Sequence, residues 1–143
     1  MTPDAIKRAN ELITTMAANG GGHAAFCTID ENGFPSASTF SIAKAGGIDE
    51  LYFATGVEGR PYADRLSKNN KACVCINSDT YTLNLVGTVE MLTDLETKQA
   101  VWHPQWVAHW TGPEDPQMLV LRFKTARYTI FFADNEDYAA GDF

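Results

Sequence analysis

The sequence contains few of the residues and motifs that mark metal, membrane or nucleic-acid proteins. Cysteine and histidine each occur only three times in 143 residues, and there is no zinc-ligand spacing, H-E-x-x-H pair, P-loop or G-x-S-x-G elbow. No apolar run is long enough to span a bilayer, and the first residues lack the apolar segment of a signal peptide. Acidic residues outnumber basic ones by 18 to 11, and the net charge of −7 disfavours non-specific binding to nucleic acid or anionic membranes. We therefore expect a cytoplasmic protein without a metal site.

The three cysteines do not suggest a disulfide framework. Cys73 and Cys75 lie two residues apart in a predicted strand, which places both side chains on the same face. A reactive pair is more typical of a C-x-x-C motif at the start of a helix. We expect these two residues to be small buried apolar residues, and Cys27 to lie in another strand.

Length and composition predict a single domain. A chain of 143 residues with 45% hydrophobic and 20% charged residues is typical of one globular domain with its own core. We place this domain at residues 1–133. Residues 134–143 are acidic and lack periodicity, so we expect a peripheral or partly disordered tail.

Short apolar segments separated by turn residues predict an antiparallel β protein. A helix capped by Thr2 comes first, and two helical segments follow Pro61 and Thr93. Gly33 is expected to adopt a positive φ in a hairpin turn, and Gly87 predicts a bend, a bulge or a close backbone approach. The fold class is mainly β (α+β), a small barrel or sheet with few helices. The predicted strands are 23–29, 34–43, 51–54, 72–76, 81–92, 118–123 and 126–132.

One stretch, residues 50–77, carries the strongest functional signal. An alternating strand ends at Gly56 and Gly59 in a loop that bears Thr55 and Arg60, and a helix begins behind Pro61. Free N–H groups in a first helical turn, with an arginine beside them, suit a phosphate group. The alternative is a strand-to-helix corner with an exposed arginine.

Other candidate sites are weaker by themselves. Ser38, Thr39 and their neighbours make a strand of small hydroxyl residues, which either faces solvent or offers polar groups to a flat ligand. The tryptophans at 102, 106 and 110 recur every four residues, which favours a core cluster, an interface or the wall of a planar ligand. His103 and His109 straddle Pro104 without a nearby carboxylate, so a metal or haem ligand role is not indicated.

Taken in order, these segments resemble a known family. The run HAAFCTIDENGFPSASTF, then LYFATGVEGRPYADRLSKNNKACVCI, LVGTVEML and VWHPQWVAHWTGPEDPQMLVLRF is similar to the flavin-binding split barrels of the pyridoxamine 5′-phosphate oxidase superfamily. Within it, the general stress protein 26 group is the most similar. The resemblance implies a six-stranded antiparallel Greek-key split barrel. It also implies a homodimer with two flavin mononucleotide (FMN) sites at the subunit interface, acting on a small-molecule substrate.

The resemblance also implies which residues hold the cofactor. Ser38, Thr39 and Phe40 would meet the isoalloxazine ring and ribityl chain, with Ala54 and Thr55 beside them. The loop before the second helix would hold the phosphate, and the partner subunit would contribute the tryptophan region. The implied cofactor-binding residues are Ser38, Thr39, Phe40, Ala54, Thr55, Arg60, Tyr62 and Trp106.

The chain departs from the family pattern at the phosphate loop. The family commonly has Ser-Arg-Lys there. Depending on the alignment, this chain has either Arg60-Pro61-Tyr62 or Gly59-Arg60-Pro61 at those positions, which in both cases leaves one basic residue where two are usual. Losing one charge-assisted hydrogen bond costs about 1.5 to 3 kcal/mol, or roughly ten- to a hundredfold in affinity. We therefore expect weak or absent FMN binding, with partial compensation from Thr55, Arg60, Tyr62 and Arg65. Phe131 also stands where the family often has tryptophan.

The resemblance predicts an FMN-dependent oxidoreductase. No side chain is an obvious general acid or base, so no catalytic residue is assigned. Two alternatives stay open: a flavin-binding stress-response protein without turnover, and a binder of haem or a deazaflavin cofactor.

Overall fold

The computed structural model describes residues 3–19 and 22–143 as three α-helices, one 3₁₀ helix and eight strands. Thr2, the predicted cap of the first helix, lies outside the described residues. The two helices predicted after Pro61 and Thr93 are present, and the first of these two begins directly after Pro61. In chain order the elements are α1 (Pro3–Asn19), β1 (His23–Ile29), β2 (Pro35–Ser41), β3 (Lys44–Gly47), β4 (Glu50–Gly56), α2 (Tyr62–Lys68), β5 (Lys71–Asn77), β6 (Tyr81–Leu92), α3 (Leu95–Val101), η1 (Pro104–Ala108), β7 (Met118–Phe132) and β8 (Asp137–Asp142).

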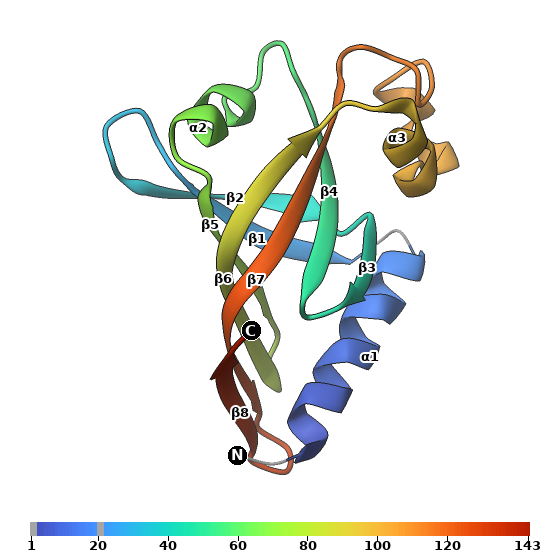
Figure 1. Ribbon diagram of the computed structural model, residues 1–143. Helices are drawn as coiled ribbons and strands as arrows, with labels where there is room; N and C mark the ends of the chain where they lie inside the picture. The colour runs from blue at the N-terminus through green and yellow to red at the C-terminus, as the bar shows by residue number, and fades with distance from the viewer. Residues whose placement is uncertain (1–2, 20–21) are drawn as a thin grey trace.

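The strands form one curled antiparallel sheet, as in a split barrel. Their order is β2-β1-β5-β6-β7-β4-β3, and β8 pairs with the remaining edge of β7. Figure 1 shows α1 along one side of the sheet, whereas α2 and α3 lie at the opposite end from the two chain termini. The predicted fold class, mainly β with a few helices, is therefore confirmed.

The sheet has eight strands, so the expected number of six was wrong. Residues 44–47, which lie between two of the predicted strands, form β3, and the two last predicted strands are one continuous strand, β7. This 15-residue strand pairs with β4 through Lys124, which leaves its second half with an open edge. The acidic tail fills that edge as β8, with Ala139 buried against the core, because unpaired strand edges need hydrogen-bond partners.

Gly87 marks a bulge that divides the sheet into two halves. Val86 pairs with Arg127 but Gly87 pairs with Thr125, so β7 contributes one extra residue at this point. A side chain at Gly87 would overlap the carbonyl oxygen of Lys124, so both the predicted bulge and the predicted close approach are confirmed. Gly33 likewise has the predicted positive φ, 84°.

The main core lies inside the curl of the sheet. Phe26, Phe40 and Phe53 pack with ring centroids 5.0 to 6.0 Å apart, in tilted or edge-to-face contacts. Helix α1 closes one side with small and branched residues at four-residue spacing, of which Ile13 is fully buried. None of the helices in the described part of the chain is long and apolar enough to cross a membrane.

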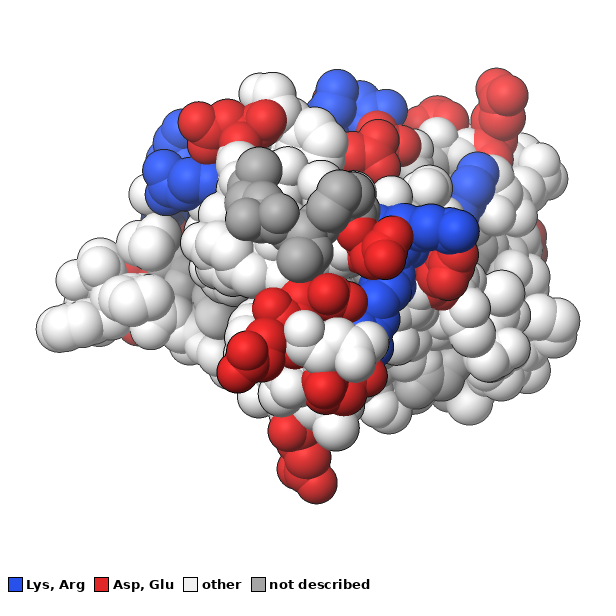
Figure 2. All heavy atoms as spheres, turned by 90° about the horizontal axis from the view of Figure 1, so that it is seen from below, with Lys and Arg blue, Asp and Glu red and all other residues white. Residues whose placement is uncertain are grey.

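The end of the molecule that holds the termini is closed by an arginine. Arg8 of α1 forms ion pairs with Asp134 and Asp137, both at 2.9 Å, and its guanidinium lies 4.0 Å from the ring centre of Phe132. Figure 2 views the molecule from this end and shows acidic side chains interspersed with basic ones. These contacts fasten β8 and its turn to the first helix.

Candidate functional site

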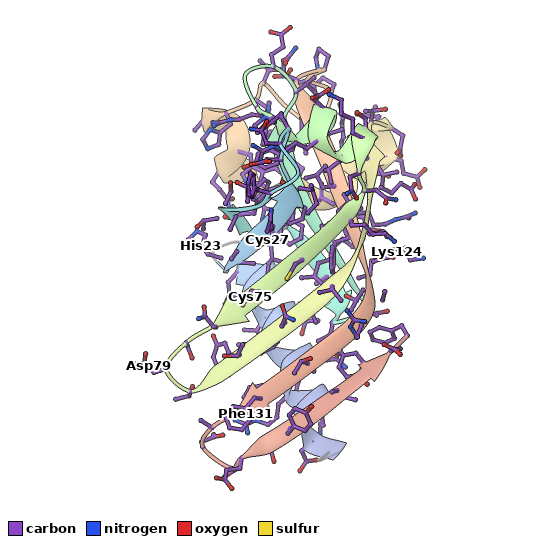
Figure 3. The ribbon with its side chains drawn as sticks, turned by 90° about the vertical axis from the view of Figure 1, so that its left-hand side faces the viewer. His23, Cys27, Cys75, Asp79, Lys124 and Phe131 are labelled. Atoms are coloured by element: carbon purple, nitrogen blue, oxygen red, sulfur yellow. The ribbon has the colours of Figure 1, made fainter. Side chains whose placement is uncertain are left out.

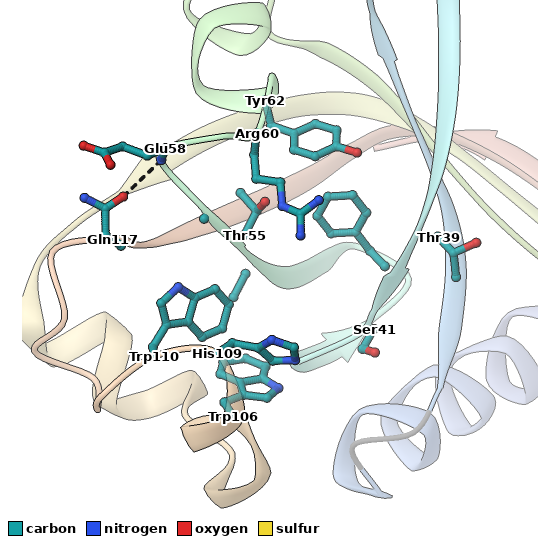
Figure 4. A pocket seen from close by; sticks show the side chains of 13 residues that line it. Thr39, Ser41, Thr55, Glu58, Arg60, Tyr62, Trp106, His109, Trp110 and Gln117 are labelled. Atoms are coloured by element: carbon teal, nitrogen blue, oxygen red, sulfur yellow. Dashed lines mark hydrogen bonds between the residues drawn. The ribbon is translucent and has the colours of Figure 1, made fainter.

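The opposite end of the sheet holds a cavity of about 650 Å³, a size typical of small-molecule sites. Strands β2 and β4, the loop before α2, and the segment from η1 to β7 surround it (Figure 4). The lining residues are Thr39, Phe40, Ser41, Ala54, Thr55, Gly56, Glu58, Arg60, Tyr62, Trp106, His109, Trp110 and Gln117.

Strand β4 leads from the core into this cavity. Leu51 and Phe53 are fully buried inside the curl, and Thr55, next on the same face, is 6% exposed where the strand meets the cavity. Beyond Gly56, the backbone N–H of Val57 donates to the carbonyl oxygen of Gln117 at 3.0 Å. A rigid strand therefore delivers Thr55 and the loop after it to a fixed place.

The loop between β4 and α2 is held from β7. The Gln117 side chain accepts a 3.0 Å hydrogen bond from the backbone N–H of Glu58, drawn as the dashed line in Figure 4. Gly59 has a φ of 74°, a left-handed conformation that turns the chain toward Arg60. The strand-loop-helix expected from the sequence is therefore present, with its loop fastened at two backbone positions.

Arg60 points its guanidinium into the cavity (Figure 4). It forms no ion pair with any residue of 3–19 or 22–143. Arg65 behaves differently, because its Nε lies 2.9 Å from a carboxylate oxygen of Glu31 and the side chain does not line the cavity. The hydrogen bond from Arg65 holds the pKa of Glu31 below its usual value. Arg65 therefore binds the turn between β1 and β2. Its position does not support the expectation that Arg65 compensates for the missing basic residue of the phosphate loop.

Tyr62 forms a buried side of the cavity. Its ring packs edge-to-face on Phe40 at 4.9 Å, and its hydroxyl donates a 2.6 Å hydrogen bond to Ser38. Ser38 is absent from the cavity lining, so its observed contact is with Tyr62. Tyr62, the first residue of α2, and Phe40 both line the cavity and both belong to the main core. The core therefore forms one wall of the cavity.

The opposite wall is aromatic. Trp106 contacts Trp102 and Trp110 in edge-to-face geometry at 5.8 and 5.6 Å, and His109 packs beside Trp110. The tryptophans also cover a second small core with Val101 and other residues, so packing and wall interpretations both apply. His103 does not reach the cavity, because its Nε2 lies 2.8 Å from the carbonyl oxygen of Ala43.

The structure brings seven of the eight predicted site residues together around this cavity, and Ser38 supports it from behind. Trp106 of this chain lines the cavity together with Arg60. The contribution of a partner subunit's tryptophan region stays a prediction. Sequence reasoning missed lining residues that adjoin predicted ones, such as Ser41 and Gly56. Gln117 carried no sequence signal, because its contact with Glu58 joins segments 59 residues apart.

The arrangement suits a planar ligand with an anionic group. Arg60 and Thr55 offer hydrogen-bond donors on one side, while Trp106 and Trp110 offer aromatic faces on the other. No group of three or more metal-ligating side chains occurs among the described residues.

Solved structures of other proteins share this fold. A structure from Clostridium acetobutylicum, related to general stress protein 26, is 23% identical with a TM-score of 0.82, covering 99% of this chain and 96% of that one. General stress protein 26 from Bacillus anthracis is 19% identical, with a TM-score of 0.72 and coverage of 93% and 97%. A pyridoxamine 5′-phosphate oxidase-related, FMN-binding protein from Nostoc punctiforme is 13% identical, with a TM-score of 0.69 and coverage of 100% and 97%.

These structural likenesses show a shared fold, and the sequence shows the family. A search of curated proteins gave no match. The sequence profile described as pyridoxamine 5′-phosphate oxidase matches residues 21–131, which include all eight predicted site residues. The chain therefore belongs to the pyridoxamine 5′-phosphate oxidase family.

Proposed function

We propose that this protein is an FMN-binding flavoprotein that acts as a homodimeric oxidoreductase. The observation that carries the proposal is the guanidinium of Arg60, which forms no ion pair with the described part of the chain and points into a cavity whose other wall is Trp106 and Trp110. FMN combines a flat aromatic ring with a phosphate that is close to doubly charged, so a cation and an aromatic wall match its two ends. The Nostoc relative of the same fold is an FMN-binding protein by name.

In this proposal each wall of the cavity has its own task. Arg60 and Thr55 hold the phosphate, while Ala54, Phe40 and Trp106 border the ring. The hydrogen bond from Tyr62 to Ser38 keeps the tyrosine ring fixed on Phe40. With one arginine in the cavity, phosphate recognition relies on fewer charge-assisted bonds than in relatives with two basic residues.

Bound FMN supplies hydride and single-electron transfer, and the protein supplies position, electrostatics and exclusion of water. The buried face of Tyr62 and Phe40 keeps one side of the cavity dry. His109 is the one histidine among the described residues that lines the cavity. No catalytic residue is assigned, because a proton-transfer role needs a known substrate.

Exposed apolar residues beside the cavity support the homodimer. Val107 on the aromatic wall is 68% exposed and Val57 on the loop is 37% exposed. A second copy packed over this rim would bury both residues and would cover the cavity from solvent.

The decisive test is to purify the protein and ask whether it binds FMN. We expect flavin absorbance at about 450 nm in the purified protein or after FMN addition, a property of the oxidised cofactor.

Arg60→Ala should weaken FMN binding roughly ten- to a hundredfold, with a smaller effect on riboflavin, which lacks the phosphate. Arg127→Ala, an exposed arginine outside the cavity, is the matched control. If wild type fails to bind FMN, the proposal is wrong; if Arg60→Ala binds FMN normally, the phosphate assignment is wrong.

The same preparation separates the remaining alternatives. Bound FMN that neither NADH, NADPH nor a flavin reductase reduces would favour a flavin-binding protein without turnover. A deazaflavin cofactor would displace FMN in a competition titration. Haem ligation by His103 has little support, because its Nε2 already contacts the Ala43 carbonyl group.

A further inference from the structure

All three cysteines lie on the outer face of neighbouring strands. Cys27 belongs to β1, Cys73 and Cys75 belong to β5, and each of them is free and partly exposed. Figure 3 labels Cys27 and Cys75 on this side of the sheet. The sequence predicted that Cys73 and Cys75 are buried, but both are partly exposed, and the fold places a third thiol from a distant segment on the same face.

The strand register pairs Cys27 with Cys73. The two residues are directly opposite in the antiparallel β1–β5 ladder, whereas Cys75 lies opposite Ala25. Directly opposite residues have Cα atoms about 4.5 to 5.5 Å apart, within the range that a disulfide spans. Cys73 and Cys75 are about 6.6 Å apart along one strand, near the upper limit. The register therefore favours a disulfide between Cys27 and Cys73 over one between Cys73 and Cys75.

We propose that Cys27 and Cys73 form a reversible cross-strand disulfide by exchange with a small disulfide such as oxidised glutathione. The thiolate of one cysteine attacks a sulfur of glutathione disulfide, which forms a mixed disulfide and releases one glutathione thiolate. The thiolate of the opposite cysteine then attacks the protein sulfur of the mixed disulfide and releases the second glutathione. The two protons lost by the cysteines are taken up by the two released glutathiones, so two protein thiols are oxidised and one glutathione disulfide is reduced.

The surroundings of Cys73 make this reaction slow at neutral pH. Burial, together with the neighbouring Cys27 and Cys75 thiols, raises the pKa of Cys73 to about 11. Its Sγ also lies 3.0 Å from Oδ1 of Asn84, which accepts from the protonated thiol. Because the thiolate is the nucleophile, closure through Cys73 should become about tenfold faster for each unit by which the pH rises toward that pKa.

The bond would tie together the segment that builds the cavity. The covalent loop between Cys27 and Cys73 contains β2, β4 and α2, with Phe40, Thr55 and Arg60 among the lining residues. Closing a loop of this length restricts the unfolded chain, so the oxidised protein should unfold at a higher temperature than the reduced protein.

The test uses the full chain, oxidised glutathione and intact mass. Reduced wild type and the variants Cys27→Ser, Cys73→Ser and Cys75→Ser are incubated with excess oxidised glutathione at pH 7 and pH 9, and remaining thiols are alkylated. Wild type and Cys75→Ser should both form one intramolecular disulfide as monomers, faster at pH 9, and in wild type Cys75 should stay outside that disulfide, as a thiol or with bound glutathione. Cys27→Ser and Cys73→Ser should form no intramolecular disulfide and should carry bound glutathione instead.

Peptide mapping of oxidised wild type makes the test independent of how the variants fold. A Cys27–Cys73 linkage and a higher melting temperature than the reduced protein support the proposal. Three unreacted thiols at pH 9, a linkage that includes Cys75, or a disulfide between two chains would overturn it. None of these outcomes depends on flavin binding, so the result is independent of the proposed function.

Discussion

The two ends of the curled sheet hold arginines in opposite circumstances. At the terminal end, Arg8 is paired with Asp134 and Asp137 and stacked on Phe132. At the cavity end, Arg60 has no ion-pair partner among the described residues and points into the cavity. An arginine whose donors are satisfied within the chain stabilises the fold, whereas one left unpaired beside an aromatic wall has donors available for a ligand. The partners of an arginine, rather than its presence, distinguish the structural end from the candidate site.

The two ends meet at Gly87, and a substitution there should have the largest effect. A valine at Gly87 would overlap the Lys124 carbonyl oxygen, which belongs to the backbone and cannot rotate away. We expect Gly87→Val to lose at least about 3 kcal/mol of unfolding free energy or to fail to fold. Both ends should suffer together, since the bulge sets the geometry of β6 and β7 on each side. Chemical denaturation with tryptophan fluorescence measures the loss.

A valine at Gly46 is the matched control for this substitution. A side chain there meets open space and the position is exposed, so Gly46→Val should change stability by less than about 0.5 kcal/mol. Equal stability of the two variants would show that the bulge tolerates a side chain and that the two halves are not joined rigidly there.

Removing Arg8 should affect the terminal end alone. Arg8→Ala loses two ion pairs and the stacking on Phe132, so its melting temperature should fall by about 2 to 5 °C. FMN affinity should not change. Lys7→Ala, an exposed neighbour on the same helix, controls for loss of a positive charge. Arg60→Ala should show the reverse pattern, with normal melting and weak FMN binding, and any other pattern would remove the distinction between the two ends.

Acid should remove the stabilisation that Arg8 gives through its ion pair with Asp134. Hydrogen bonding from Arg8 holds the pKa of Asp134 below its ordinary value near 3.8. A carboxylate whose pKa is lowered in the folded state stabilises the protein at any pH above its ordinary pKa. This stabilisation disappears as the pH falls through the lowered pKa. The melting difference between wild type and Arg8→Ala should therefore be constant from pH 7 to pH 5 and should shrink below about pH 4. A difference that persists undiminished at pH 3 would mean that packing on Phe132, not charge, is the stabilising contact.

The sequence predicted the cavity end better than the terminal end. Local signals place Thr55, Gly59, Arg60 and Pro61 within a few residues of one another, and a strand-loop-helix needs little else. The tail gave the opposite result, because its acidic composition suggested a peripheral segment. It becomes β8 only because β7 is longer than β4 and presents an open edge. Contacts between distant segments, such as Arg8 with Asp134, Gln117 with Glu58 and Cys27 with Cys73, leave no local pattern and need the fold.

Glu58 should have the smallest effect, and it refines the contrast between the two ends. This exposed carboxylate lines the cavity near Arg60 without forming an ion pair with it in the described structure, so it opposes an anionic ligand. At roughly 10 Å in a water-like medium, its repulsion of a doubly charged phosphate costs about 0.8 kcal/mol before screening by salt. Glu58→Gln should therefore tighten FMN binding about threefold at roughly 0.01 M salt and less than twofold at about 0.15 M.

The affinity of Glu58→Gln for riboflavin should stay unchanged, since riboflavin lacks the phosphate. Glu136→Gln, in the turn before β8 at the other end, should leave both affinities unchanged. Equal tightening of FMN and riboflavin by Glu58→Gln would show that Glu58 acts on the ring or on the loop conformation, and the phosphate would then lie elsewhere in the cavity.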